Sequence, residues 1–151
     1  MRSTLFIFLL AIACTSAPSD IDKVELSTLD GTTIDWNQYK GKIVFVNFWA
    51  TWCKPCLQEM PTIAKAMTLP ESSNVVFLFA SNESVELIER FKAKQGFDFD
   101  FVQAQNLESL NVQALPTTFI FDESGNQIFL EAGYRDWSTP ESLALFNSKN
   151  H

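Results

Sequence analysis

Apolar residues along this chain gather in runs and stripes that predict alternating strands and helices. Nearly continuous apolar runs lie within residues 43–49, 74–80 and 117–122, and such runs are typical of strands buried on both faces. Residues 55–67 have helical composition, and residues 85–91 carry apolar side chains at helical spacing. This order of strands and helices predicts an α/β domain with a mixed sheet covered by helices on both faces.

Weaker patterns complete the predicted sheet. The spacing of Ser138 and Glu141 is that of a capping box, which predicts the start of a last helix. The other expected elements are a strand at 24–28, a helical turn at 35–39, a short strand at 99–102, a helical turn at 107–110 and a hairpin strand at 127–131.

The N-terminal residues predict an export signal that is not part of the fold. Arg2 gives a positive start, and the apolar run at 5–13 is too short to span a bilayer but suits a secretory signal. Residues 10–14 resemble the lipobox of bacterial lipoproteins, in which Cys14 becomes the lipidated first residue. Ordinary cleavage and a buried N-terminal helix are the alternatives. We therefore expect a signal peptide at 1–13, a lipid-anchor tether at 14–22 and one domain at 23–151.

Composition narrows the possible functions. A net charge of -7 argues against a general affinity for nucleic acid, because phosphate binding needs clustered Lys and Arg. The chain has three cysteines, an odd count for an exported protein, and a lipidated Cys14 would leave Cys53 and Cys56 as the remaining pair. The only histidine is His151, so we expect neither a metal site nor a cofactor.

Cys53 and Cys56 stand where a strong strand gives way to a helix. At a helix N-terminus, free N–H groups and the helix dipole stabilise a thiolate, and Lys54 adds a positive charge beside Cys53. Cys56 lies one turn deeper on the same face, close enough to form a disulfide. The spacing predicts an exposed nucleophile at Cys53 and a resolving thiol at Cys56.

Two structural explanations of this cysteine pair are weaker than a redox role. A disulfide that closes so small a loop constrains little of the unfolded chain, on the order of 2 kcal/mol. A zinc site needs four ligands, and the pair has no histidine nearby. The residues therefore indicate thiol–disulfide exchange.

The run from Phe48 to Cys56, together with residues 115–119 and Gly133, resembles the thioredoxin superfamily. Asn47 before the motif, the pair Glu59 and Pro61 after it, and the long segment 81–115 are similar to the TlpA/ResA branch of membrane-tethered bacterial proteins. The resemblance implies a thioredoxin fold with an N-terminal hairpin and a central insertion.

The resemblance also implies roles for single residues. Pro116 matches the family's cis-proline, which helps Leu115 pair with the substrate backbone, and Trp52 lies on the rim of that site. Glu59 matches an acidic residue that exchanges a proton with Cys56 and raises the thiol pKa values. An ordinary exposed helix residue is the alternative for Glu59. Pro61 is expected to kink the helix.

Taken together, these features predict a monomeric thiol–disulfide oxidoreductase in the bacterial cell envelope, facing the periplasm. We expect it to reduce disulfides in exported proteins, apocytochrome c among the candidates, and to be re-reduced by a membrane thiol donor. The opposite direction, an oxidant that forms disulfides, is the second hypothesis. Two further alternatives are a peroxiredoxin-like peroxidase and a copper chaperone or non-catalytic binding lipoprotein. This chain lacks the Pro that a peroxidase would need ahead of Cys53, and it lacks the His that copper carriage would need beside the cysteines.

Overall fold

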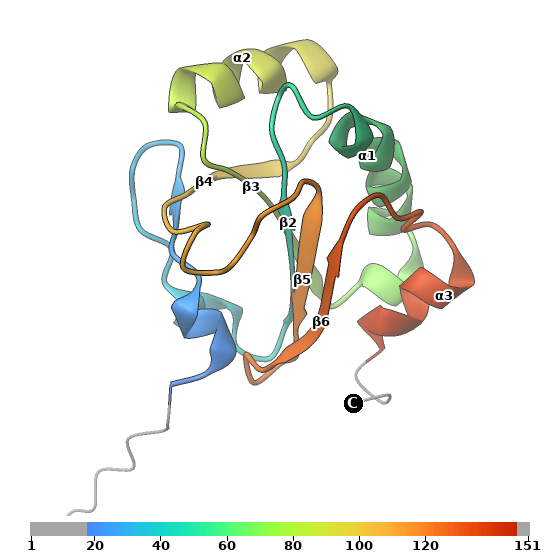
Figure 1. The fold of residues 1–151 in the computed structure, drawn as a ribbon. Coiled ribbons are helices and arrows are strands. Elements are labelled where there is room, and N and C mark those ends of the chain that lie inside the picture. Colours follow the sequence, from blue (N-terminus) through green and yellow to red (C-terminus); the bar gives the residue numbers. More distant parts are fainter. Residues whose placement is uncertain (1–17, 148–151) are drawn as a thin grey trace, which may run out of the picture.

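The computed structural model describes residues 18–147, which form one sheet flanked by helices (Figure 1). The strands are β1 (Leu26–Thr28), β2 (Ile43–Phe48), β3 (Val75–Ser81), β4 (Asp100–Ala104), β5 (Thr117–Phe121) and β6 (Gln127–Ala132). Their order across the sheet is β1-β4-β3-β2-β5-β6. The central strands β2, β3 and β4 are parallel, whereas β1, β5 and β6 join antiparallel. The sheet is therefore mixed, as the sequence predicts.

Three α-helices and four 3-10 helices lie within the described residues. The α-helices are α1 (Lys54–Met67), α2 (Val85–Gln95) and α3 (Pro140–Leu143), and the 3-10 helices are η1 (Asp20–Lys23), η2 (Trp36–Tyr39), η3 (Pro70–Ser72) and η4 (Ala144–Phe146). Between residues 18 and 147, no helix has the length and apolar character needed to cross a membrane.

Every residue of β2 is buried, because the sheet is covered on both faces. Alternate side chains face opposite sides, so Phe45 belongs to the core that also contains the buried apolar residues of the three α-helices, while Val44 and Val46 belong to the core on the other side. That other side is covered by η1, η2 and the segment 107–112. Helices thus flank both faces, as expected, but the α-helices gather on one of them.

The expected N-terminal hairpin and central insertion are both present. The chain turns after β1 and returns through a bridge between Ser27 and Thr33, and β1 also pairs with β4. Helix α2 and strand β4 form the insertion between β3 and β5. Ile88 and Phe91 anchor α2 in the same core as α1, so the insertion packs directly behind the cysteine motif.

Residues 107–110 form the expected helical turn, in which the N–H of Leu110 donates to the carbonyl of Asn106 over 3.2 Å. The predicted start of the last helix was wrong by one residue. The cap of α3 is Thr139, which accepts a hydrogen bond from the N–H of Ser142, whereas Ser138 bonds to Asp136. Pro140 explains the shift, since proline favours the first helical position and so places the cap one residue before itself.

The described chain is already folded within the expected tether. Residues 20–22 belong to η1, where Ile21 is buried and its N–H donates to the carbonyl of Gly125. The folded region therefore includes residues assigned from sequence to the tether at 14–22. The expected signal peptide and Cys14 lie outside the described residues.

Candidate active site

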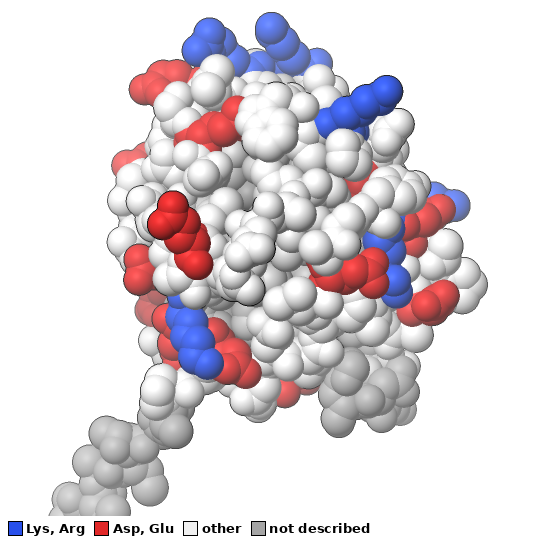
Figure 2. Space-filling model, in the orientation of Figure 1, with Lys and Arg blue, Asp and Glu red and all other residues white. Residues whose placement is uncertain are grey.

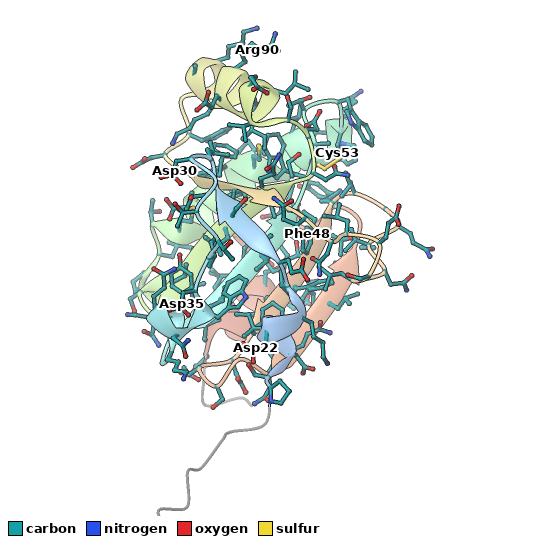
Figure 3. All side chains as sticks on the ribbon, turned by 90° about the vertical axis from the view of Figure 1, so that its left-hand side faces the viewer. Asp22, Asp30, Asp35, Phe48, Cys53 and Arg90 are labelled. Atoms are coloured by element: carbon teal, nitrogen blue, oxygen red, sulfur yellow. A yellow bond between two sulfur atoms is a disulfide. The ribbon has the colours of Figure 1, made fainter. Side chains whose placement is uncertain are left out.

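The cysteine pair lies at the junction of β2 and α1 (Figure 3). Cys53 is the N-cap residue of α1, and its sulfur forms a disulfide with Cys56, with the two Cα atoms 5.3 Å apart. The N–H of Cys56 donates to Sγ of Cys53 over 3.3 Å. The pairing predicted from spacing is therefore present, and the helix N-terminus directs a donor at the sulfur of Cys53.

The surroundings of the disulfide are open on one side. Cys53 is only 3% exposed and Cys56 1%, so Cys53 is less exposed than predicted, because its sulfur is bonded to the buried Cys56. Lys54 and Pro55 beside it are exposed, and Trp52 is 74% exposed. A partner that reaches this end of α1 meets Trp52 before it meets the sulfur atoms.

The loop before β5 brings a second predicted element to the same end of the sheet. The peptide bond between Leu115 and Pro116 is cis, as the resemblance implies. Thr117, the first residue of β5, is paired with Phe48, the last residue of β2. Pro116 and the cysteine motif therefore lie at neighbouring strand ends, and Gly133 holds this loop by donating its N–H to the carbonyl of Pro116 over 2.8 Å.

Glu59 is fully buried inside this region, so the alternative of an exposed helix residue is excluded. Its Oε1 accepts hydrogen bonds from Nε1 of Trp137 at 2.7 Å and from the N–H of Arg135 at 3.1 Å. Its Oε2 accepts from Nδ2 of Asn47 at 3.0 Å. The same amide nitrogen donates to Thr118 at 2.9 Å. All three partners of Glu59 are donors, an arrangement that suits a carboxylate.

Burial and hydrogen bonding act on the Glu59 carboxyl in opposite directions. Burial is the larger effect and raises the pKa of Glu59 from 4.5 to about 7, although hydrogen bonds from Trp137, Asn47 and Arg135 lower it. The charge of Glu131 adds a smaller upward shift. Glu59 lies one helical turn after Cys56 on α1. A group on this face with a pKa near neutrality can exchange protons with a thiol.

The polar end of β3 supports the loop that precedes Cys53. The carboxylate of Glu83 accepts from the backbone N–H of Thr51 at 2.7 Å and from its hydroxyl at 2.8 Å. Ser81 donates to the same carboxylate at 3.3 Å. Glu83 therefore ties the β3–α2 connection to the residues immediately before the cysteine motif.

Several of these contacts were not predicted from the sequence. Trp137 and Arg135 lie more than 70 positions from Glu59, and Glu83 lies 32 positions from Thr51. Residues so far apart in the sequence form no local pattern from which these hydrogen bonds could be predicted. The one available signal is Trp137 within the polar segment 135–139, since a single aromatic residue among polar ones favours a buried anchor.

Between residues 18 and 147, no group of three or more His, Cys, Asp or Glu side chains is arranged to hold a metal ion.

Known proteins match this chain over most of its length. Residues 17–127 match the AhpC/TSA family. The thiol-disulfide oxidoreductase ResA of Bacillus subtilis is 33% identical over 122 residues, which cover 78% of this chain and 68% of that protein. ResA of Geobacillus thermodenitrificans is 38% identical over 104 residues, which cover 66% of this chain and 60% of that protein. The chain thus spans less than two thirds of the Geobacillus relative.

A solved structure agrees with these sequence matches. A thioredoxin family thiol:disulfide interchange protein from Chlorobium tepidum superposes with a TM-score of 0.68 at 25% identity, covering 87% of this chain and 98% of that protein. The six-stranded sheet, the disulfide at the start of α1 and the cis-proline loop are the features described above. With this fold and these matches, the chain belongs to the AhpC/TSA family of thioredoxin-like proteins, in the group of the ResA thiol–disulfide oxidoreductases.

Proposed function

We propose that this protein is a thiol–disulfide oxidoreductase that reduces disulfides in exported proteins. The observation that carries the proposal is the placement of Cys53 and Cys56 at the start of α1, with the buried carboxyl of Glu59 one turn further along the same helix. A disulfide with a structural purpose alone would not require a buried acid beside it.

Exchange proceeds in two displacements at sulfur. The Cys53 thiolate attacks one sulfur of the substrate disulfide, forms a mixed disulfide and expels the other substrate sulfur as a thiolate. The Cys56 thiolate then attacks Sγ of Cys53, closes the disulfide present here and releases the second substrate thiolate. Two electrons pass from the dithiol to the substrate, and each released thiolate takes up a proton.

Glu59 acts in the second displacement. Cys56 must lose its proton to become the attacking thiolate, and it is buried away from bulk water. The Glu59 carboxylate accepts that proton because burial raises the pKa of Glu59 to about 7, nearer to that of a thiol. Asn47 on β2 carries no titratable group, so it cannot accept the proton and instead orients the carboxylate through Nδ2.

Trp52, Leu115 and Pro116 form the proposed contact surface for the substrate. Trp52 is largely exposed, and the cis bond before Pro116 lies at the neighbouring strand end. Residues 109–121 contain no charged side chain, and Figure 2 shows a broad uncharged area on the face in front of β5. This surface suits an extended polypeptide bound through its backbone and apolar side chains.

The cellular setting of the proposal follows from the N-terminal residues. In this proposal the protein is a monomer. Lipidation at Cys14 would attach it to the membrane of a bacterial cell envelope, where it would face the periplasm. A membrane thiol reductant would regenerate the dithiol, and apocytochrome c is one candidate substrate. The similarity to ResA thiol–disulfide oxidoreductases supports the redox activity on which this setting depends.

Insulin reduction tests the assignment of the two cysteines. Cys53→Ser is expected to lower the rate to that of the uncatalysed reaction, because the nucleophile is lost. Cys56→Ser is expected to stall as a mixed disulfide between Cys53 and insulin. In cells, the same variant would trap the physiological partner, which mass spectrometry would identify. Retention of activity by Cys53→Ser would refute the assignment.

The reduction potential decides between a reductase and the alternative oxidant. A reductase is expected to have a potential nearer to that of thioredoxin, about -270 mV, than to that of DsbA, about -120 mV. Equilibration with glutathione or thioredoxin measures this value. A potential near that of DsbA would favour an oxidant that installs disulfides.

A peroxidase function receives no support from the surroundings of Cys53. The hydroxyl of Thr51, two residues before it, is bonded to the Glu83 carboxylate at 2.8 Å. Thr51 is thus held by the β3–α2 connection and not by the sulfur. A rate of peroxide consumption by the reduced protein comparable to its insulin reduction would contradict this.

A further inference from the structure

Trp137 makes the shortest hydrogen bond to the Glu59 carboxyl. Its indole Nε1 donates to Oε1 of Glu59 over 2.7 Å, against 3.0 Å for the amide of Asn47 and 3.1 Å for the backbone of Arg135. Trp137 is itself only 1% exposed. A donor that is shielded from water in this way acts strongly on a charged acceptor.

The indole ring is fixed from several elements at once. The backbone N–H of Trp137 donates to the hydroxyl of Thr62 on α1 over 3.1 Å. The ring meets Phe45 of β2 edge-on with centroids 4.7 Å apart, and it stacks on Phe146 of η4. On its other side lies the guanidinium of Arg135, 5.6 Å from the ring centroid. The position of the donor is therefore determined by the core and not by Glu59.

We propose that Trp137 is a positioning residue that fixes the Glu59 carboxylate and sets the pH range over which Glu59 takes up the proton of Cys56. The inference rests on the proposed function, because it assigns to Trp137 control over the proton step of that reaction. The segment 133–137 thereby connects the cis-proline loop with the carboxyl of Glu59. Gly133 holds the carbonyl of Pro116, while Arg135 and Trp137 hold Glu59.

The other groups around Glu59 are one thiol, one carboxylate, a guanidinium that is already paired, and two uncharged side chains. On α1 the titratable neighbour is Cys56, and on β6 it is Glu131, whose charge raises the pKa of Glu59. The guanidinium of Arg135 is paired with Glu131 and Glu141, at 3.3 and 3.6 Å. From β2 and β5 the uncharged side chains of Asn47 and Thr118 complete the surroundings.

Trp49 provides a matched control for Trp137. Both are fully buried tryptophans in the same core. Nε1 of Trp49 has no hydrogen-bond partner, and it is the one such buried side-chain atom between residues 18 and 147. Replacing Trp49 by Phe thus removes ring volume and an indole N–H without removing a hydrogen bond to Glu59.

The test compares the pH profiles of Trp137→Phe and Trp49→Phe in the resolving step. The rate at which Cys56 releases a thiol bound to Cys53 should rise with pH through the pKa of Glu59. Loss of the donor in Trp137→Phe is expected to shift this midpoint upward by about one pH unit. Trp49→Phe is expected to leave the midpoint in place. An unchanged midpoint in an active Trp137→Phe protein would overturn the inference without affecting the assignment of the cysteines.

A second measurement uses the unmodified protein, so it does not depend on how well the variant folds. In nitrogen-15 spectra, the indole N–H signal of Trp137 is expected to shift with pH at the midpoint of Glu59, and that of Trp49 is expected to stay constant. Glu59→Gln should abolish the titration of the Trp137 signal. A Trp137 signal that does not follow pH in the folded protein would refute the proposal even if Trp137→Phe cannot be purified.

Discussion

Glu59 is a buried acid whose ionised form is supported by donors but penalised by burial. Burial prevails, and the folded protein holds a proton on Glu59 up to a pKa of about 7, whereas the unfolded chain releases it near 4.5. Between these two pH values the folded state binds more protons than the unfolded state. Its contribution to stability is therefore complete below pH 4.5 and is lost as the pH rises toward 7.

This linkage gives a prediction for unfolding of the oxidised protein. The part of the unfolding free energy due to Glu59 is expected to fall by about 3 kcal/mol from pH 4.5 to above pH 7. Denaturant titrations at several pH values are run in parallel on the parent protein and on Glu59→Gln. The difference between their unfolding free energies at each pH gives the contribution of Glu59. A pH-independent difference between the two proteins would show that Glu59 titrates in the folded state much as it does in the unfolded chain.

Glu83 is a half-buried carboxylate that accepts hydrogen bonds from the backbone and the side chain of Thr51. Glu83→Ala removes two hydrogen bonds to Thr51, and we expect it to lower the unfolding free energy by about 2 kcal/mol, because bonds to charged groups are stronger than neutral ones. The matched control is Glu89→Ala, an exposed glutamate on α2, for which a change below about 0.5 kcal/mol is expected. Equal effects of the two substitutions in chemical denaturation would argue against the role of Glu83.

Single residues were predictable where chemistry is local and unpredictable where it depends on distant contacts. The disulfide between Cys53 and Cys56 follows from their spacing, and the cis bond at Pro116 follows from the resemblance. The acidic residue Glu59 was also identified, but its full burial and its bond to Trp137 were not. Those depend on the path of the chain after β6, which no pattern near Glu59 reveals.

At the scale of elements, apolar runs predicted the strands well, because a strand buried on both faces needs an uninterrupted apolar segment. The predicted range 43–49 compares with Ile43–Phe48 for β2, and 117–122 with Thr117–Phe121 for β5. The bounds of the short elements were less predictable, because the ends of short elements depend on tertiary contacts. The strand expected at 24–28 begins at Leu26, and the strand expected at 99–102 is observed at Asp100–Ala104.

The shifted start of α3 can be tested directly. Thr139→Ala is expected to lower the unfolding free energy by about 1 kcal/mol, because the cap then loses its bond to the N–H of Ser142. Ser138→Ala, at the position that the capping-box pattern indicated, is expected to cost less, because Ser138 bonds to Asp136 and not to the helix. A larger loss from Ser138→Ala would restore the sequence-based assignment.

For the whole molecule, the reactive end and the N-terminal end lie at opposite poles. Cys53 is near one end of the sheet, whereas Asp22 and Asp35 are at the other in Figure 3. The hydrogen bond from Ile21 to Gly125 agrees with this, because Gly125 follows the end of β5 that lies furthest from Pro116. The sheet itself therefore separates the first described residues from the dithiol.

This separation predicts how immobilisation affects activity. Protein coupled to beads through p-azidophenylalanine in place of Asn37, an exposed residue of η2, is expected to reduce insulin at nearly the rate of free protein. Coupling through the same group in place of Trp52 is expected to abolish most of the rate, because the bead then covers the proposed substrate surface. Similar rates from both attachments would place the substrate surface elsewhere.

Because the N-terminal end and the dithiol lie at opposite ends of the sheet, an anchor at Cys14 would limit the distance between the dithiol and the membrane. Four residues, extended, reach at most about 14 Å from Cys14 to Pro18. Strand β2 spans about 20 Å between the η1 end and the cysteines. The dithiol would then operate no more than roughly 34 Å above the membrane surface. A partner with its disulfide farther from the bilayer would be out of range, so the length of the connecting segment would itself select among substrates.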